Sequence, residues 1–322
     1  TIHGRGARRG VSFFESENFV WHNGEWLKLD MPKKASFGGI VDGRILFSTN
    51  EEWRIGNTVY APDSILSADL AEFKANPDKA AKTLVWAPGP KQTSQGSAIT
   101  KDALYVSLLD NVRGRVLRFN FDGGKWTSTP VALPQNATVG IAAASDTTGE
   151  VMFSSTDFLS PSQLWYSDGT GVPAVLKTSP ERFDATGLKI SQFEATSKDG
   201  TKIPYFVVAK DGVKLDGNTP TLLYGYGGFQ VPQLPGYSGT LGKLWLEKGG
   251  AYVLGNMRGG GEFGPEWHQT AMGANKQRTW DDFIAIGDDV VKRGLTSPKR
   301  LGIQGGSQGG LLVGTAFTQR PD

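Results

Sequence analysis

Short hydrophobic runs separated by turn residues fill the first half of the chain. Residues 19–21 and 26–29 are apolar-rich runs on either side of an Asn23-Gly24 turn, which is the pattern of a β-hairpin. A related unit then returns three times, as a turn pair followed by an apolar run that ends in serine and by a second run. The first runs are residues 45–48, 104–107 and 151–154, and the second runs are residues 65–68, 116–119 and 164–167. Strand units that recur every ~40–50 residues are typical of β-propeller blades, although an ordinary meander or sandwich gives the same pattern.

The pattern changes near residue 185. Two runs joined by a Lys198-Asp199-Gly200 turn predict a second hairpin, and three later apolar runs predict short buried strands. The hairpin runs are residues 188–195 and 203–209, and the buried runs are residues 221–224, 252–254 and 301–303.

Helical spacing occurs between these strands. Leu241, Leu244 and Trp245 have it just before Gly249-Gly250, a pair suited to a helix C-terminus. The clearest helix spans residues 276–293, where six positions form one continuous stripe, which Gly294 ends. The stripe is Trp280, Phe283, Ile284, Gly287, Val290 and Val291.

We therefore expect two domains. Residues 1–184 predict an all-β, propeller-like domain of about four blades, an incomplete ring. Residues 185–322 alternate strands with helices, which predicts an α/β domain with a mostly parallel sheet covered on both faces.

The composition argues against several classes of partner and of chemical site. The 322 residues are 38% hydrophobic, enough to fill real cores, and the formal charge of +2 argues against nucleic acid or a membrane surface as partner. Zero cysteines and three scattered histidines, His3, His22 and His268, indicate no thiol nucleophile, no metal site and no cofactor. The chain starts at Thr1 and stops at Asp322 without the usual signals of a boundary, so we expect a fragment, with localisation left open between cytoplasm and periplasm.

The sharpest chemical signal is Gly-Gly-Ser-Gln-Gly-Gly at residues 305–310. It contains G-x-S-x-G between a predicted strand and a predicted helix, the context of a nucleophile elbow. Glycines at 305 and 309 relieve crowding at a sharp turn that lifts the Ser307 hydroxyl clear of the sheet. The main-chain amide of Gln308 can then face a developing oxyanion. A phosphate-binding glycine loop or a plain strand-to-helix turn is the alternative.

A serine nucleophile needs a base. In α/β-hydrolase sheets the order is Ser, then Asp or Glu, then His, yet only 15 residues follow Ser307, and they hold Asp322 but no histidine. His268 lies upstream, on the wrong side for this topology, and we interpret it as a structural or surface histidine. The chain as given lacks the Asp and His of a triad and is expected to be inactive.

Six segments, in order, resemble the prolyl oligopeptidase family of serine peptidases. Among them are Leu-Tyr-Gly-Tyr-Gly-Gly-Phe and Arg-Gly-Gly-Gly-Glu-Phe-Gly. The six are residues 197–204, 223–229, 258–264, 296–301, 305–312 and 319–322. The resemblance implies an α/β-hydrolase domain, truncated after the elbow helix, preceded by part of a seven-bladed propeller. It also implies a serine endopeptidase that cleaves short peptides, and the Tyr-Gly-Tyr-Gly-Gly-Phe motif favours cleavage after proline over the basic-residue and dipeptidyl-peptidase branches.

The resemblance also assigns roles to residues. Ser307 matches the family nucleophile, Tyr226 matches a phenol that donates to the tetrahedral intermediate, and the Gln308 amide is the second donor. Phe229 matches a residue near the specificity pocket, where an apolar ring suits proline. Without the resemblance, Tyr226 and Phe229 would be interpreted as packing aromatics. Gln308 replaces the family's usual asparagine, which retains the amide donor but changes the side-chain contacts.

Two further hypotheses stay open. Arg258 and Glu262 flank three glycines and are interpreted as structural residues, in the form of an ion pair between the two. The missing histidine also suits a different protein, a propeller-based binding protein with a degenerate, non-catalytic hydrolase half.

Overall fold

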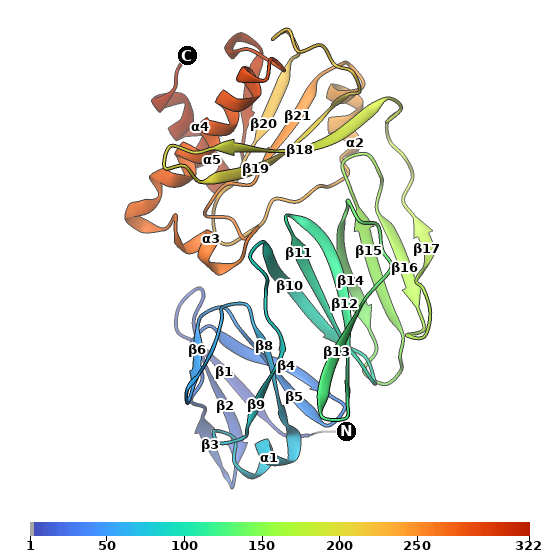
Figure 1. Ribbon diagram of the computed structural model, residues 1–322, viewed down its shortest axis with the longest axis vertical. Helices are drawn as coiled ribbons and strands as arrows, with labels where there is room; N and C mark the ends of the chain where they lie inside the picture. Colours follow the sequence, from blue (N-terminus) through green and yellow to red (C-terminus); the bar gives the residue numbers. More distant parts are fainter. Residues whose placement is uncertain (1–2) are drawn as a thin grey trace.

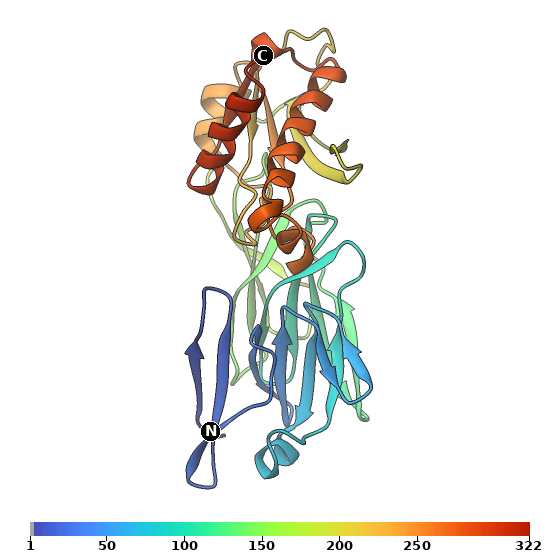
Figure 2. The same cartoon turned by 90° about the vertical axis from the view of Figure 1, so that its left-hand side faces the viewer.

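The computed structural model describes residues 3–322 in two parts that follow one another along the long axis of the molecule (Figure 1). Antiparallel sheets make up the first part, which ends with a strand at Thr178. The second part begins with a strand at Leu188 and combines one sheet with helices. Figure 2 shows from the side that the helices α4 and α5 belong to the second part alone.

The first part is built from meanders, in which strands adjacent in sequence pair antiparallel. A three-stranded sheet comprises β1 (Gly6–Gly10), β2 (Ser16–His22) and β3 (Glu25–Lys28). The next sheet comprises β4 (Ala35–Val41), β5 (Arg44–Thr49), β8 (Ile65–Asp69) and β9 (Lys82–Trp86), with the hairpin of β6 (Trp53–Ile55) and β7 (Thr58–Tyr60) and helix α1 (Leu70–Ala75) as insertions.

Two further four-stranded meanders follow. They are β10 (Gln92–Ile99), β11 (Leu104–Asp110), β12 (Arg113–Asp122) and β13 (Lys125–Pro130), and then β14 (Thr138–Ala144), β15 (Val151–Thr156), β16 (Gln163–Ser167) and β17 (Ala174–Thr178). The recurring runs of the sequence are the second and third strands of each four-stranded sheet: β5 with β8, β11 with β12, and β15 with β16. The predicted repeat is thus a structural repeat.

Successive sheets pack on one another through apolar side chains. One core joins Leu46 and Ile65 of the second sheet to Leu104 and Val106 of the third. Another joins the third sheet to Phe153 of the fourth. Each inner strand therefore buries side chains on both faces, which explains its nearly continuous apolar pattern.

The second part contains a five-stranded sheet in the order β18-β19-β21-β20-β22. Its strands are β18 (Leu188–Thr196), β19 (Lys202–Lys210), β21 (Ala251–Gly255), β20 (Thr221–Tyr224) and β22 (Leu301–Gln304). β20 pairs parallel with both β21 and β22, whereas the β18–β19 and β19–β21 pairs are antiparallel. The sheet is mixed, so the prediction of a mostly parallel sheet is wrong for the described strands.

Helices cover both faces of this sheet, as predicted. Tyr205 and Val207 of β19 face the core shared with α4 (Gln277–Lys292) and α5 (Gln308–Gln319). Phe206 and Val208, one residue out of phase, face the other core. That core includes residues of α2 (Gly239–Leu241) and of the π-helical turn η1 (Gly242–Leu246).

The segment near Leu241 departs from an ordinary helix. It is a single α turn that continues as the π-helical η1. A Cβ at Gly242 would lie 2.0 Å from the ring of Phe183, so the backbone here packs directly on that ring. The remaining helical turns of this part are α3 (Pro265–Gln269), η2 (Gly273–Asn275) and η3 (Pro298–Arg300). Within residues 3–322, no helix combines the length and the hydropathy that a membrane span requires.

Candidate active site

Ser307 occupies a sharp turn between β22 and α5. The strand ends at Gln304, two glycines follow, and the helix begins at Gln308. Ser307 has φ 53° and ψ −117°, a backbone conformation that is costly for a residue with a side chain. The residue is exposed, and its hydroxyl has no hydrogen-bond partner within residues 3–322. Strand, turn and helix thus follow in the predicted order.

Backbone crowding around the turn explains its glycines. A Cβ at Gly305 would lie 2.3 Å from the carbonyl oxygen of Gly309, and a Cβ at Gly309 would lie 2.5 Å from the carbonyl oxygen of Gly225. Both contacts are with main chain, which cannot rotate away. The predicted role of these two glycines is therefore visible as a direct steric requirement.

The loop after β20 lies beside this turn. Because β20 and β22 are parallel neighbours, with Tyr224 opposite Gln304, their carboxyl ends meet at one edge of the sheet. Gly225 N–H donates to the Gln304 carbonyl at 3.1 Å, and a Cβ at Gly228 would lie 2.4 Å from Cγ of Gln308. Residues 225–228, which include the half-buried Tyr226, are thus packed against the start of α5.

Gln308 presents two groups at this edge. Its main-chain N–H is at the first position of α5 and donates to no acceptor within the described residues. Its side chain lies against Gly228, and its Nε2 atom is buried without a partner in the described part. The amide is therefore open to a ligand at the helix N-terminus.

Phe229 follows at the outer end of the same loop. It has φ 53°, its side chain is 48% exposed, and its ring packs edge-on against Phe13 with centroids 5.6 Å apart. Phe13 belongs to the turn between β1 and β2 and is itself 79% exposed. This contact brings the first part of the chain next to the candidate site.

The prediction of an ion pair between Arg258 and Glu262 is wrong. Arg258 instead binds Asp282 on α4, with Nη2–Oδ1 at 2.6 Å and Nε–Oδ2 at 2.9 Å, and Asp199 with Nη1–Oδ2 at 2.6 Å. Burial lowers the pKa of Arg258, but the hydrogen bonds that it donates to Asp282 and Asp199 outweigh this and raise it. Those bonds also hold the pKa of Asp199 well below its usual range.

Glu262 is a separate buried acid. It is 1% exposed, and its Oε1 accepts from the Gln233 N–H at 2.8 Å and from Asn256 Nδ2 at 3.4 Å. Its Oε2 and the Oδ1 of Asn256 are buried without partners among the described residues. Burial raises the pKa of Glu262 to about 7, so the carboxyl is about half protonated at neutral pH and largely protonated in mildly acidic solution.

His268 is a buried histidine of α3. Its Nδ1 lies 2.7 Å from the Gly259 carbonyl and 3.1 Å from the Gln230 N–H, and its ring packs against Phe14 with centroids 5.3 Å apart. Burial lowers its pKa. These contacts fit a structural role, and none of them involves Ser307.

Residues 3–322 contain no group of three or more metal-ligating side chains close enough to hold an ion. The Ser307 hydroxyl and the Gln308 main-chain N–H lie at this edge of the sheet, beside the loop that carries Tyr226. Such a set suits attack on a carbonyl and stabilisation of the resulting oxyanion.

Comparisons with known proteins support the resemblance to the prolyl oligopeptidase family. Residues 237–322 match the model of the prolyl oligopeptidase family. An uncharacterized peptidase of Sinorhizobium fredii is 44% identical over 320 residues, which are 98% of this chain and 44% of that protein. The solved structure of a post-proline cleaving enzyme from Rickettsia typhi aligns with a TM-score of 0.90 and 32% identity, over 98% of this chain and 47% of that one. The resemblance to the prolyl oligopeptidase family is confirmed.

A prolyl endopeptidase of Elizabethkingia miricola is 38% identical over 193 residues, which are 60% of this chain and 27% of that protein. The chain thus spans less than half the length of each of these three relatives.

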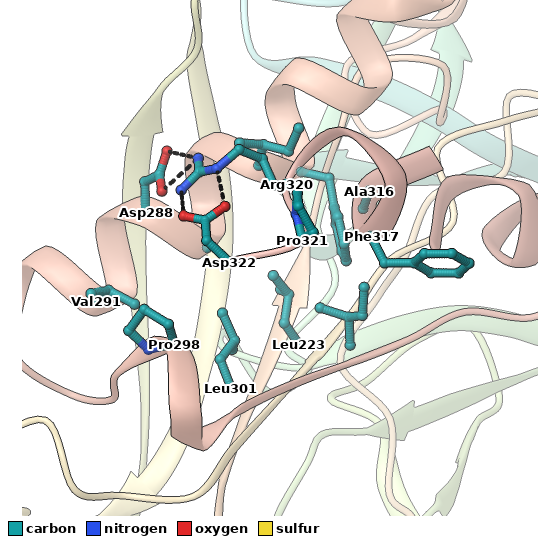
Figure 3. Close-up of a pocket in the computed structure, with 14 residues that line it drawn as sticks. Leu223, Asp288, Val291, Pro298, Leu301, Ala316, Phe317, Arg320, Pro321 and Asp322 are labelled. Atoms are coloured by element: carbon teal, nitrogen blue, oxygen red, sulfur yellow. Dashed lines mark hydrogen bonds and ion pairs between the residues drawn. The ribbon is translucent and has the colours of Figure 1, made fainter. Parts of the chain in front are cut away.

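A cavity of about 290 Å³ lies elsewhere, between β22, α4 and the end of α5 (Figure 3). It is lined by apolar residues such as Leu301 and by Arg320, whose guanidinium binds Asp288 at 3.1 Å and Asp322 at 2.9 Å. Ser307 is at the opposite end of the 12-residue α5, ~18 Å away along the helix axis. Leu223 and Ile303, in the strands that lead to the site, also line the cavity, but none of residues 305–315 does.

Proposed function

We propose that this chain is the nucleophile-bearing portion of a serine oligopeptidase that hydrolyses short peptides after proline. The observation that carries the proposal is the strained backbone of the exposed Ser307, at a turn that packs beside the Tyr226 loop and leads into α5. Backbone strain at an exposed serine is typical of a functional site and has no packing benefit. It therefore favours an enzyme over a binding protein with a degenerate hydrolase half.

The proposed chemistry is acyl transfer. Ser307 Oγ attacks the scissile carbonyl, the leaving amine departs with a proton, and water hydrolyses the acyl-enzyme. The Tyr226 hydroxyl and the Gln308 N–H donate to the oxyanion of each tetrahedral intermediate. The loss of one such donor typically lowers kcat by ~10²–10³-fold.

The proposal includes a division of the chain. Residues 1–184 form blades of a propeller, about four in number, which restricts access to short peptides. Residues 185–322 form the first portion of an α/β-hydrolase domain. The face-to-face packing of successive meanders and the similarity to the Rickettsia typhi enzyme support this division.

Phe229 is the proposed contact for the proline ring of the substrate. Its exposed ring lies one residue beyond Gly228, which packs on Gln308. An exposed apolar surface next to the nucleophile suits an apolar side chain of the peptide.

We also propose that residues 1–322 alone do not turn over peptides. Attack by Ser307 needs a general base, and His268, the histidine of the second part, is engaged with Gly259 and Gln230. The triad His and Asp are then contributed by sequence other than this stretch.

The test uses the protein expressed from its complete open reading frame and a fluorogenic peptide with proline before the scissile bond. Ser307→Ala is expected to abolish turnover, and Ser160→Ala, at an exposed serine outside the site, is expected to leave it unchanged. Turnover by the Ser307→Ala variant at the rate of the unsubstituted protein would contradict the proposal. Residues 1–322 expressed alone are expected to give no turnover.

A further inference from the structure

Lys276 directs its charge at the loop that carries Tyr226. Its Nζ donates to the Gly227 carbonyl at 2.5 Å, although the two residues are 49 positions apart in sequence. The same ammonium lies 5.1 Å from the centre of the Trp280 ring, a cation–π contact. A Cβ at Gly259 would lie 3.1 Å from Nζ, so the head group is enclosed by main chain on this side.

This charge is not neutralised by an acid. None of the ion pairs within residues 3–322 includes Lys276, and the buried carboxylate of Asp282, also on α4, is bound to Arg258. Burial lowers the pKa of His268 on α3, and the charge of Lys276 lowers it further. A partly buried cation without a carboxylate partner costs stability, so packing alone does not explain a lysine here.

The contact reaches the proposed oxyanion hole through the backbone. Gly227 has φ +64°, and a Cβ there would lie 2.3 Å from Cγ2 of Thr279, one turn beyond Lys276. Thr279 Oγ1 in turn donates to the Arg258 carbonyl at 2.8 Å. Two contacts thus fix Gly227, the residue after Tyr226, to the start of α4: the hydrogen bond from Lys276 and the close packing of Thr279.

We propose that Lys276 is a positioning residue that fixes the Tyr226 loop and adds positive potential where the oxyanion forms. The inference rests on the proposed function, because it assumes that Tyr226 donates to the oxyanion. A neutral side chain of similar length fills the same space without the hydrogen bond or the charge. An arginine keeps both.

Burial lowers the pKa of Lys276 to about 8. The ammonium charge is therefore lost as the pH rises through about 8, and the bond to the Gly227 carbonyl loses its charge assistance and weakens. Arginine stays protonated throughout this range.

The experiment measures kcat and KM for a proline-containing fluorogenic peptide, with the protein expressed from its complete open reading frame. Lys276→Met is expected to lower kcat about tenfold or more, with KM changed less than about threefold. Lys276→Arg is expected to restore most of kcat and to remove the loss of rate above pH 8. Lys292→Met, at an exposed lysine at the other end of α4, is the matched control and is expected to have no effect.

A double-mutant cycle with Tyr226→Phe separates positioning from general destabilisation. Lys276→Met is expected to cost much less kcat in the Tyr226→Phe background, because the donor it positions is already gone. Equal losses in both backgrounds, or an unchanged kcat for Lys276→Met, would overturn the inference. Thermal unfolding monitors folding, and Lys276→Leu replaces the methionine variant if that variant unfolds at the assay temperature.

The two proposals fail in different ways. If the Ser307→Ala variant keeps its turnover, the proposed function and the assignment of Ser307 as nucleophile are both contradicted. If activity depends on Ser307 but kcat is unchanged in Lys276→Met, only the proposed role of Lys276 is contradicted.

Discussion

At the scale of single residues, close packing leaves no space for a side chain at three glycines of the Tyr226 loop. Gly225, Gly227 and Gly228 would each bring a Cβ within 2.5 Å of a packed side chain. These contacts press the Tyr226 loop against α4 and α5, so the loop has little room to move. The motif glycines therefore set the distance between the loop and the nucleophile turn, and the polar residues act from fixed positions.

Glu262 is expected to make stability depend on pH. Its pKa is raised from 4.5 to about 7 by burial, so between these values the folded chain retains a proton that the unfolded chain releases. Stability therefore falls as the pH rises from about 4.5 to about 7, by about 3 kcal/mol in total, and levels off above that range. Thermal unfolding at pH 5 and pH 8 measures this change.

The control for this prediction is a pair of amide variants. Glu262→Gln stays neutral at every pH, so its unfolding temperature should lose most of the dependence between pH 5 and pH 8. Glu266→Gln, at an exposed acid four residues on, should keep the full dependence. A Glu262→Gln profile that matches the unsubstituted protein would contradict a raised pKa at this carboxyl.

At the scale of elements, one ion-pair network joins α4 to the loop after β21. Arg258 lies in that loop, Asp282 is on α4 with 0% exposure, and Ser197 Oγ donates to the same carboxylate at 2.6 Å. Asp199 of the β18–β19 turn completes the network. It fixes the Arg258–Gly259 backbone, which lies next to Lys276 and against the Gly227 carbonyl of the Tyr226 loop.

Removal of Arg258 is expected to be strongly destabilising. Arg258→Met leaves the Asp282 carboxylate buried and unpaired, which typically costs about 3–5 kcal/mol. Arg54→Met, which breaks an exposed pair with Glu52, should cost no more than about 1 kcal/mol. Denaturant unfolding of both variants checks the contrast, and equal costs would contradict a structural role for the Arg258 network.

Elements were predictable from sequence where local pattern decides them. The paired runs of the first part and the α4 stripe were read correctly because strand and helix periodicity are local. The place of β21 between β19 and β20 could not be read, since it depends on pairing across distant segments. For the same reason Arg258 was assigned to Glu262, its neighbour in sequence, when its partners lie 24 and 59 residues away.

The site divides in the same way. Ser307 and the glycines around it lie in one continuous segment, so the motif and its context were sufficient to single them out. Lys276 contacts Gly227 across 49 residues. Its only signal in the sequence was its place at the start of the predicted helix, which does not reveal what its ammonium meets.

At the scale of the whole molecule, polar and aromatic contacts connect the two parts at several points of their boundary. Lys91 pairs with Glu194 at 3.1 Å, but both side chains are exposed, so this pair contributes little. Thr138 Oγ1 donates to the Pro235 carbonyl at 2.6 Å at another point of the boundary. The aromatic contact between Phe13 and Phe229 is the one that touches a proposed substrate-binding residue. The first part is thus positioned to influence what the site binds.

Phe13→Ala is expected to weaken substrate binding without disabling the chemistry. An edge-to-face aromatic pair is worth about 0.5–1.5 kcal/mol beyond its buried area. If Phe13 holds the Phe229 ring in place, its loss should raise KM for a proline-containing peptide about 2–10-fold and leave kcat nearly unchanged. Trp26→Ala is the control, because Trp26 is another exposed aromatic of the same sheet, and its ring pairs with Trp21 instead. Equal KM values for the two variants would mean that the first part of the chain does not reach the peptide through Phe229.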